Sequence, residues 1–186
     1  MAKLIYVSNV SLDGCIEDEH GDFDWTAPDD EVFGFVTDVV RPVGTHLYGR
    51  RLYETMAVWE TDSTLGAQSD LYAAFADLWQ AADKVVFSTT MDAATTARTQ
   101  VVRQFDADVV RAIEDAATGD LMVGGAHLAA QAFAAGLVHE CHLFVHPVLI
   151  GRGKRALPAD TRADLALLDE RRFANGVVYV RYGILR

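Results

Sequence analysis

Two glycine-containing junctions in the chain have the residue types that bind phosphate groups. In the first, a short apolar run ends at Val123 and is followed by Gly124 and Gly125. Ala126 then opens an alanine-rich segment of helical composition. Glycines at such a junction permit a tight turn and a close approach of a ligand to the main chain. The N-terminus of the expected helix directs free N–H groups and its positive dipole end at a phosphate.

The second junction adds positive charge to the same chemistry. An expected strand over residues 45–49 ends at Gly49, and Arg50 and Arg51 follow in the first turn of an expected helix. Cations at a helix N-terminus oppose the helix dipole. Their placement is explained if an anion lies over the junction. The alternative is a pair of solvated arginines. For Arg51 the two interpretations have equal weight, whereas for Arg50, next to the glycine, we favour the functional one.

The elements around these junctions predict an α/β domain over residues 1–186. Apolar runs such as residues 4–10 and 121–125 have the pattern of buried parallel strands, and they alternate with amphipathic segments such as residues 69–82. Near the C-terminus, two strand patterns flank Asn175-Gly176, which is a strong hairpin signal. We therefore expect a mixed, mostly parallel sheet that closes with antiparallel strands.

Composition excludes several classes of protein. The chain has 16 basic and 27 acidic residues, a net charge of −11, which is unsuited to binding nucleic acid through bulk electrostatics. No apolar stretch approaches the length of a membrane span, and the N-terminus lacks a signal-peptide pattern. Two cysteines without a CxxC pair suggest a reducing compartment. We expect a soluble, cytoplasmic protein.

Five stretches of the chain together form a recognisable pattern. In order, they are Ser11-Leu12-Asp13-Gly14, residues 48–54, residues 86–90, Val123-Gly124-Gly125 and residues 146–153. This pattern resembles the dihydrofolate-reductase-like superfamily, in the branch that resembles the reductase half of the bifunctional riboflavin-biosynthesis deaminase/reductase. The resemblance covers essentially the whole chain and implies a three-layer fold, with a mostly parallel mixed sheet, helices on both faces and a C-terminal antiparallel hairpin.

The resemblance also implies hydride transfer from NADPH, with the dinucleotide lying along the carboxyl ends of the strands. Gly124 and Gly125 would lie under the pyrophosphate, between Val123 and Ala126. Gly49 and Arg50, with Arg51 beside them, would lie on the adenosine side. Ser88 and Thr89 resemble residues that receive the ribose 2′-phosphate. Hydroxyl donors and a guanidinium suit that phosphate, so selection of NADP over NAD is expected.

Reduction of a C=N or C=O group also needs a proton. Asp30 follows Trp25 and Pro28 at the spacing of the acidic residue in folate reductases, which makes it one candidate. Its alternative role is ordinary stabilisation of a helix N-terminus. Asp13 is the rival, because its motif belongs to the riboflavin branch, in which it would contact substrate or shape the loop. Residues 13–25 resemble a loop that closes over nicotinamide and substrate and excludes water.

The resemblance leaves three functions open. The first is an NADPH-dependent reductase of a small heterocyclic or ribosylaminopyrimidine-like substrate, similar to 5-amino-6-(5-phosphoribosylamino)uracil reductase. The others are an NADP(H)-binding protein without chemistry and a dihydrofolate reductase proper, from which the Ser-x-Asp-Gly loop departs. We expect a homodimer through the C-terminal strands, since bifunctional relatives pair there and an exposed edge is otherwise a liability.

A zinc site is a weaker alternative for one strand. Glu140, His142 and His146 alternate onto one face of an expected strand, and histidines on a strand can bind zinc. No compact ligand spacing completes the set, so we expect no metal and interpret these as sheet-face or interface histidines.

Overall fold

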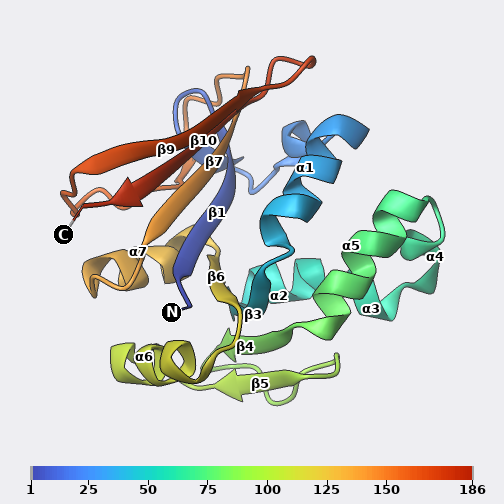
Figure 1. The fold of residues 1–186 in the computed structure, drawn as a ribbon, viewed down its shortest axis with the longest axis vertical. Helices are drawn as coiled ribbons and strands as arrows, with labels where there is room; N and C mark the ends of the chain where they lie inside the picture. The colour runs from blue at the N-terminus through green and yellow to red at the C-terminus, as the bar shows by residue number, and fades with distance from the viewer. Residues whose placement is uncertain (1, 186) are drawn as a thin grey trace.

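An eight-stranded sheet forms the centre of the computed structural model, which describes residues 2–185 (Figure 1). The strand order is β5-β4-β3-β6-β1-β7-β10-β9, and the six strands from β5 to β7 are parallel. β10 and β9 add an antiparallel pair at one edge. The strands are β1 (Leu4–Ser11), β3 (Val43–Gly49), β4 (Asp83–Phe87), β5 (Thr99–Val102), β6 (Asp120–Gly124), β7 (Glu140–His146), β9 (Leu165–Arg172) and β10 (Val178–Ile184).

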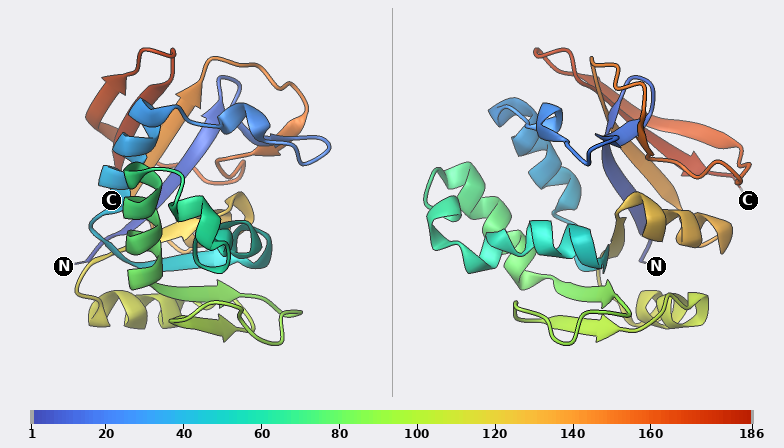
Figure 2. Two further views of the ribbon diagram at one scale, coloured as in Figure 1. Left: turned by 90° about the vertical axis from the view of Figure 1, so that its right-hand side faces the viewer. Right: turned by 180° about the vertical axis from the view of Figure 1, so that it is seen from behind.

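Helices cover both faces of this sheet, so the molecule has three layers (Figure 2). One face carries α1 (Asp30–Val40), α2 (Arg50–Met56) and α5 (Asp70–Ala81). The opposite face carries α6 (Ala107–Ala116) and α7 (Ala126–Ala134). Short pieces complete the chain: η1 (Asp24–Thr26), α3 (Val58–Thr61) and α4 (Ser63–Gly66).

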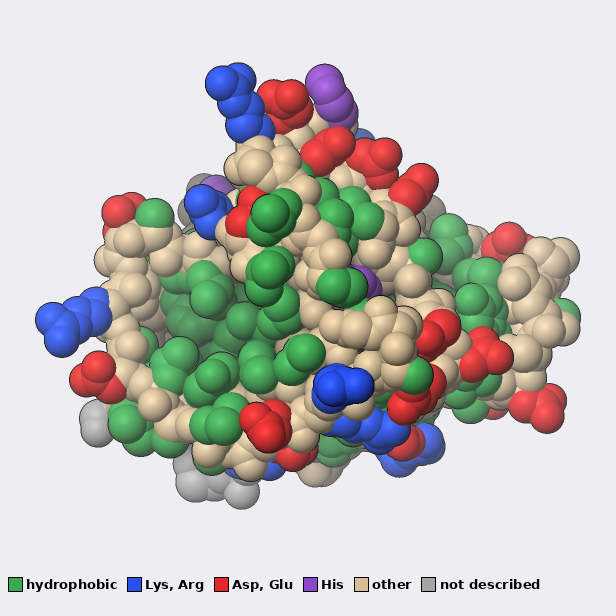
Figure 3. All heavy atoms as spheres, turned by 90° about the horizontal axis from the view of Figure 1, so that it is seen from above, with side chains coloured by type: hydrophobic (Ala, Val, Ile, Leu, Met, Phe, Trp, Pro, Cys, Tyr) green, Lys and Arg blue, Asp and Glu red, His purple; other side chains and the backbone are tan. Residues whose placement is uncertain are grey.

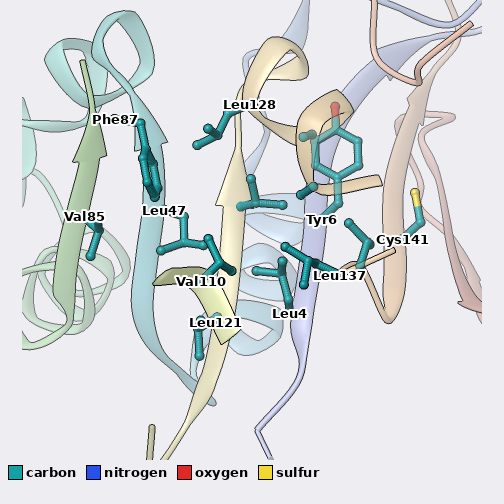
Figure 4. Packing of buried hydrophobic residues seen from close by; sticks show 14 residues of the cluster. Leu4, Tyr6, Leu47, Val85, Phe87, Val110, Leu121, Leu128, Leu137 and Cys141 are labelled. Atoms are coloured by element: carbon teal, nitrogen blue, oxygen red, sulfur yellow. The ribbon is translucent and has the colours of Figure 1, made fainter. Parts of the chain in front are cut away.

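The alternation of side chains along the parallel strands supplies a separate core to each face. On the α6 and α7 face, Leu4 and Tyr6 of β1 pack with Leu121 of β6 and Leu128 of α7 (Figure 4). On the α1 and α5 face, aromatic side chains dominate, with Trp79 almost fully enclosed. Strands buried on both faces need a nearly continuous apolar sequence, which is what the chain provides.

Local caps explain where the main helices begin. The Asp29 side chain accepts a hydrogen bond of 2.9 Å from the Val32 N–H at the start of α1. Ser69 caps α5 and Asp106 caps α6 in the same way. Each cap satisfies a backbone donor that the first helical turn leaves free.

The predicted three-layer α/β fold with a C-terminal antiparallel pair is confirmed. The hairpin turns at Gly176, whose φ of +89° lies in the left-handed region that favours glycine. None of the helices in residues 2–185 has the length and apolar character needed to cross a membrane.

The structure also contains a second, two-stranded sheet that we did not predict. β2 (Cys15–Asp18) pairs antiparallel with β8 (Gly153–Arg155). Part of the expected loop over residues 13–25 is therefore fixed against the segment that follows β7. The short helices α3 and α4 were not predicted either.

Candidate functional site

The predicted phosphate-binding motifs lie side by side along one edge of the sheet. Tyr48 is the register partner of Gly124, so the junctions at Gly49 and Gly125 lie at the ends of the neighbouring strands β3 and β6. Gly49 is in turn the partner of Phe87, the residue before Ser88, at the end of β4. The three motifs thus come from adjacent parallel strands, and all lie at carboxyl ends. Ligands of open α/β sheets bind at such an edge.

A turn after β4 has two guanidinium groups on it. Ser88 is buried, and its hydroxyl accepts hydrogen bonds from the N–H groups of Thr90 and Met91, at 3.3 and 3.0 Å. Arg50 donates to the hydroxyl of Thr90 at 3.0 Å. Arg103, just beyond the end of β5, donates to the carbonyl of Met91 at 2.8 Å. Two exposed positive charges therefore flank the turn in a strongly acidic protein.

Arg103 is a site residue that the sequence did not reveal. It directly follows β5, and no motif marks it. Its place beside Arg50 depends on the parallel pairing of β4 and β5, which brings residues far apart in the sequence to one turn. The available signal was the largely β-branched run Thr99–Val102 before it, which is typical of a strand.

The helix α2 fixes the segment after this turn. The hydroxyl of Tyr53 accepts hydrogen bonds from the N–H groups of Thr95 and Thr96, at 2.9 and 3.1 Å. Arg50 is also held from its own helix, because its Nε donates to Glu54 Oε1 at 2.7 Å. The guanidinium is therefore oriented before any ligand arrives, which lowers the entropy lost on binding.

Gly124 and Gly125 differ in why they are glycine. A Cβ at Gly124 would lie 2.5 Å from Leu52 Cδ2 and 3.1 Å from Tyr48 Cδ1. The packing of Leu52 and Tyr48 against this backbone therefore favours glycine independently of a ligand. The approach of a ligand to Gly124 stays a prediction. Gly125 has a φ of +86° and stands at the N-terminus of α7 without a side-chain cap. At Gly49 an added Cβ meets nothing within 4 Å.

The other predicted cofactor residues occupy different environments. Val123 is fully enclosed in the core, and Ala126 is buried in the first turn of α7. Thr89 is exposed on the turn after β4. Arg51 is exposed, and its guanidinium makes no ion pair within residues 2–185. Ala126, Thr89 and Arg51 therefore lie at the carboxyl edge of the sheet. The side chain of Val123 points into the core, so only its backbone could face a ligand.

The Asp13 carboxylate connects two loops at the carboxyl ends of β1 and β7. It accepts hydrogen bonds from the Ser11 hydroxyl at 2.6 Å, from the Ile150 N–H at 3.1 Å and from the Gly151 N–H at 2.6 Å. These donors, Ser11 first, lower the pKa of the carboxyl from 3.8 to about 2. An acid this strong is ionised near neutral pH, so the geometry suits a loop-shaping role better than proton donation.

This arrangement predicts a pH dependence. A carboxyl whose pKa is lowered by folding stabilises the folded state above its unfolded pKa, near 3.8, and loses that contribution as the pH falls towards about 2. We expect the amide resonances of Ile150 and Gly151 to titrate with a midpoint near pH 2. In Asp13→Asn this titration should be absent. A titration midpoint near pH 4 in the unsubstituted protein would contradict the hydrogen bonds that Asp13 accepts in the structure.

Asp30 lies at the start of α1 as predicted, and its side chain is exposed. The capping residue is its neighbour Asp29. Asp30 has no hydrogen bond or ion pair from its side chain within the described chain. Its catalytic role stays a prediction.

A polar cluster lies beside this helix at the ends of β1 and β7. His146 is 5% exposed, and its Nε2 is 3.0 Å from Asn9 Oδ1. The Trp25 ring lies edge-on to the imidazole, with the centroids 5.6 Å apart. Burial lowers the pKa of His146 below its usual value of 6.5. We had interpreted His146 only as a sheet-face histidine or a weak zinc candidate.

Glu140 and His142 bond to each other and to the sheet. The carboxylate Oε2 of Glu140 is 3.2 Å from Nε2 of His142, and the Nδ1 of that ring is 2.8 Å from the hydroxyl of Tyr179. Both ring nitrogens of His142 therefore have protein partners. Within residues 2–185, no group of three histidine, cysteine or acidic side chains is arranged to hold a metal ion.

Two cavities of about 340 and 680 Å³ lie at the opposite end of the sheet. The first is lined by residues around the starts of β1 and β7, including Ala2 and His139. The second lies between α6 and the starts of β4 and β5. The predicted phosphate-binding motifs lie at the carboxyl ends of β3, β4 and β6, so the candidate site is at that edge and not in either cavity.

Comparisons with known proteins agree with this architecture. The chain is 29% identical over 181 residues to the uncharacterized protein YyaP of Bacillus subtilis (strain 168), across 97% of this chain and 94% of that protein. A putative riboflavin biosynthesis protein from Shewanella sp. PV-4 has the same fold, with a TM-score of 0.77, 18% identity and full coverage of both chains.

A longer solved structure shares the fold over part of its length. It is a diaminohydroxyphosphoribosylaminopyrimidine deaminase/5-amino-6-(5-phosphoribosylamino)uracil reductase from Thermotoga maritima, with a TM-score of 0.65 and 15% identity. The match covers 99% of this chain but 57% of that one. Residues 2–179 match the model of the RibD C-terminal domain. The chain therefore belongs to the RibD C-terminal domain family, whose fold is dihydrofolate-reductase-like and whose members are reductase-like.

Proposed function

We propose that the protein is an NADPH-dependent reductase that transfers a hydride to a small heterocyclic, ribosylaminopyrimidine-like substrate. The observation that carries the cofactor assignment is the pair of guanidinium groups, Arg50 and Arg103, on the turn after β4. Arginine suits a phosphate dianion because its donors form a planar fork. The hydroxyls of Thr89 and Thr90 supply further donors beside that position.

The other predicted residues fit the remainder of a dinucleotide. The free N–H groups at the start of α7, after Gly125, suit a pyrophosphate. Gly49 lies on the neighbouring strand, between this junction and the turn after β4, and leaves room above its backbone. A bound NADPH would supply the hydride, and the chain would orient its nicotinamide towards the ends of β1 and β7.

The proposal is tested by oxidation of NADPH in the presence of candidate substrates. We expect the absorbance of NADPH at its reduced-nicotinamide band to fall when 5-amino-6-(5-phosphoribosylamino)uracil is added, and not when dihydrofolate is added. If NADPH is oxidised with dihydrofolate and not with the ribosylaminopyrimidine, the protein is a folate reductase. Binding of NADPH without turnover of either compound would favour the second function.

That second function is NADP(H) binding without reduction, and one observation favours it. The two predicted acids differ from a typical proton donor, because Asp13 is hydrogen-bonded as a carboxylate and Asp30 is exposed. A proton donor needs a pKa near the working pH. If Asp30 does donate the proton, we expect Asp30→Asn to lower kcat about 100-fold, within the usual range for general acids, without changing the affinity for NADPH.

We further propose a homodimer that pairs through the C-terminal strands. On β10, Tyr179 faces α1, so Val178, Val180 and Tyr182 face the opposite side of the sheet. Leu165 and Leu167 of β9 lie opposite Ile184 and Tyr182 and are 45% and 52% exposed. Seen from above, hydrophobic side chains gather in a hollow on the side of the molecule where the chain ends (Figure 3). Exposed apolar patches of this kind mark contact surfaces.

Replacing Leu167 by glutamate tests this dimer. A carboxylate at the centre of an apolar contact is desolvated without a partner, so we expect dissociation to monomers at micromolar concentration. Light scattering measures the mass. Glu170→Gln, on the same strand, is the matched control and should leave the dimer intact. A monomeric parent protein, or a dimeric Leu167→Glu variant, would contradict the proposed surface.

The cytoplasmic location also stays a prediction.

A further inference from the structure

The cluster of Asn9, Trp25 and His146 has hydrogen-bonding groups that the proposed cofactor does not use. Asn9 lies in β1 and His146 ends β7, so the two side chains come from adjacent parallel strands. Trp25, in η1, lies against the imidazole at an angle of 80° between the ring planes. β1 lies between β7 and β6, the strand that leads to Gly124 and Gly125. The cluster therefore lies at the same carboxyl edge of the sheet as the proposed pyrophosphate position, on the two strands that follow β6 in the sheet.

The contact with Asn9 fixes which nitrogen of His146 carries the proton. The Oδ1 atom of Asn9 can only accept, so Nε2 of His146, at 3.0 Å, is the donor. Burial lowers the pKa of the imidazole, which keeps the ring neutral near neutral pH. In this tautomer Nδ1 presents a lone pair, and within residues 2–185 it has no hydrogen-bond partner. His146 is thus a pre-oriented acceptor.

Trp25 provides the complementary group. Its indole N–H can only donate, and this atom is buried without an acceptor in the described chain. Buried donors in native proteins nearly always have partners, so an unpaired one points to a ligand or a water molecule. A donor and an acceptor therefore lie on two rings that touch each other.

We propose that Trp25 and His146 together bind the amide edge of the substrate heterocycle, with the indole N–H donating to its carbonyl oxygen and Nδ1 accepting from its ring N–H. Asn9 is a positioning residue that holds the imidazole in the required tautomer. This assignment rests on the proposed reductase function. It identifies residues that bind the substrate, as distinct from those that bind the cofactor. It requires a heterocycle that has a carbonyl next to a ring N–H.

The direct test compares two ligands on the purified, isotope-labelled protein without NADPH. Uracil has the required edge, whereas 1,3-dimethyluracil keeps both carbonyls and has no N–H. We expect uracil to bind at least tenfold more tightly, the usual result of leaving a buried polar group unpaired. Uracil should also move the indole proton resonance of Trp25 downfield. That resonance is assigned by its absence in Trp25→Phe.

Variants then separate recognition from structure. His146→Phe keeps a flat ring but removes the acceptor, so discrimination between the two ligands should disappear. Arg111→Gln, at an exposed residue of α6 that pairs with Asp108, should keep it. In Asn9→Ala, the nitrogen shifts of His146 should change from those of the Nε2-protonated ring to those of a mixture, with weaker uracil binding. If His146→Phe does not fold, the ligand comparison and the nitrogen shifts of the unsubstituted protein still decide.

Three results would overturn the assignment: equal affinity for both ligands, a protonated Nδ1 in the neutral ring, or no uracil binding up to its solubility. NADPH binding is measured separately on the same samples. If NADPH does not bind while the discrimination persists, the reductase proposal fails and the edge assignment stands. If NADPH binds and the discrimination is absent, the edge assignment fails and the reductase proposal stands.

Discussion

Replacing both Arg50 and Arg103 by glutamine should weaken NADPH binding about 100-fold and leave NADH binding within about twofold. Hydrogen bonds to charged groups contribute roughly 1.5–3 kcal/mol each. Both guanidinium groups are exposed, so the lower end of that range applies, and each loss corresponds to about a tenfold change in the dissociation constant. NADH lacks the 2′-phosphate and should not sense the change. Titration calorimetry with both cofactors gives the two ratios.

The control for this experiment is a surface arginine far from the proposed site. Arg111 lies on α6, is exposed and pairs with Asp108, so Arg111→Gln removes the same charge elsewhere. We expect it to change NADPH affinity by less than about twofold, because a distant exposed charge is screened by salt. Equal weakening of NADPH and NADH in the double variant would place the arginines outside a 2′-phosphate site.

Substituting Gly153 by alanine should destabilise the pairing of β2 with β8 by about 3 kcal/mol, the upper end of the cost of overpacking. An added Cβ would lie 2.2 Å from the carbonyl oxygen of Glu17 and 3.2 Å from Cys15 Cβ. The obstacle is backbone, so no rotation of a side chain relieves it, and the two strands must separate. Hydrogen exchange of the amides in Cys15–Asp18 measures the local opening free energy.

Gly49→Ala is the matched control for the glycine change. Its Cβ would meet no atom within 4 Å, and its φ of −78° is open to any residue. We expect exchange in Cys15–Asp18 to be unchanged in this variant. Unchanged exchange in Gly153→Ala as well would mean that residues 15–18 and 153–155 are not paired in solution.

Local patterns predicted much of this molecule. Apolar strand runs such as residues 4–10 and the hairpin signal at Asn175-Gly176 indicated elements that the structure contains. The glycine junctions at Gly49 and Gly125 were found because a strand, a glycine and a helix follow one another in the chain. Their adjacency at one edge was expected from the resemblance and is given by the register of β3, β4 and β6.

Contacts between distant residues could not be predicted in the same way. His146 and Asn9 are 137 positions apart, and so are Asp13 and Ile150. No periodicity links such pairs, since their meeting depends on the order of strands in the sheet. For the same reason the sequence showed Asp13 as a possible acid but not the donors Ile150 and Gly151 that, with Ser11, hold it ionised. It also gave no sign that β8 would fix part of the loop over residues 13–25.

The most direct test of the proposed function is the relative affinity of the unsubstituted protein for NADPH and NADH, measured through tryptophan fluorescence. Trp25 lies at the end of the sheet edge along which the dinucleotide is proposed to bind, so its emission should report binding. We predict that NADPH binds at least tenfold more tightly than NADH, as expected for a phosphate held by two guanidinium groups. Equal affinities, or no binding of either cofactor at high micromolar concentration, would contradict the proposal.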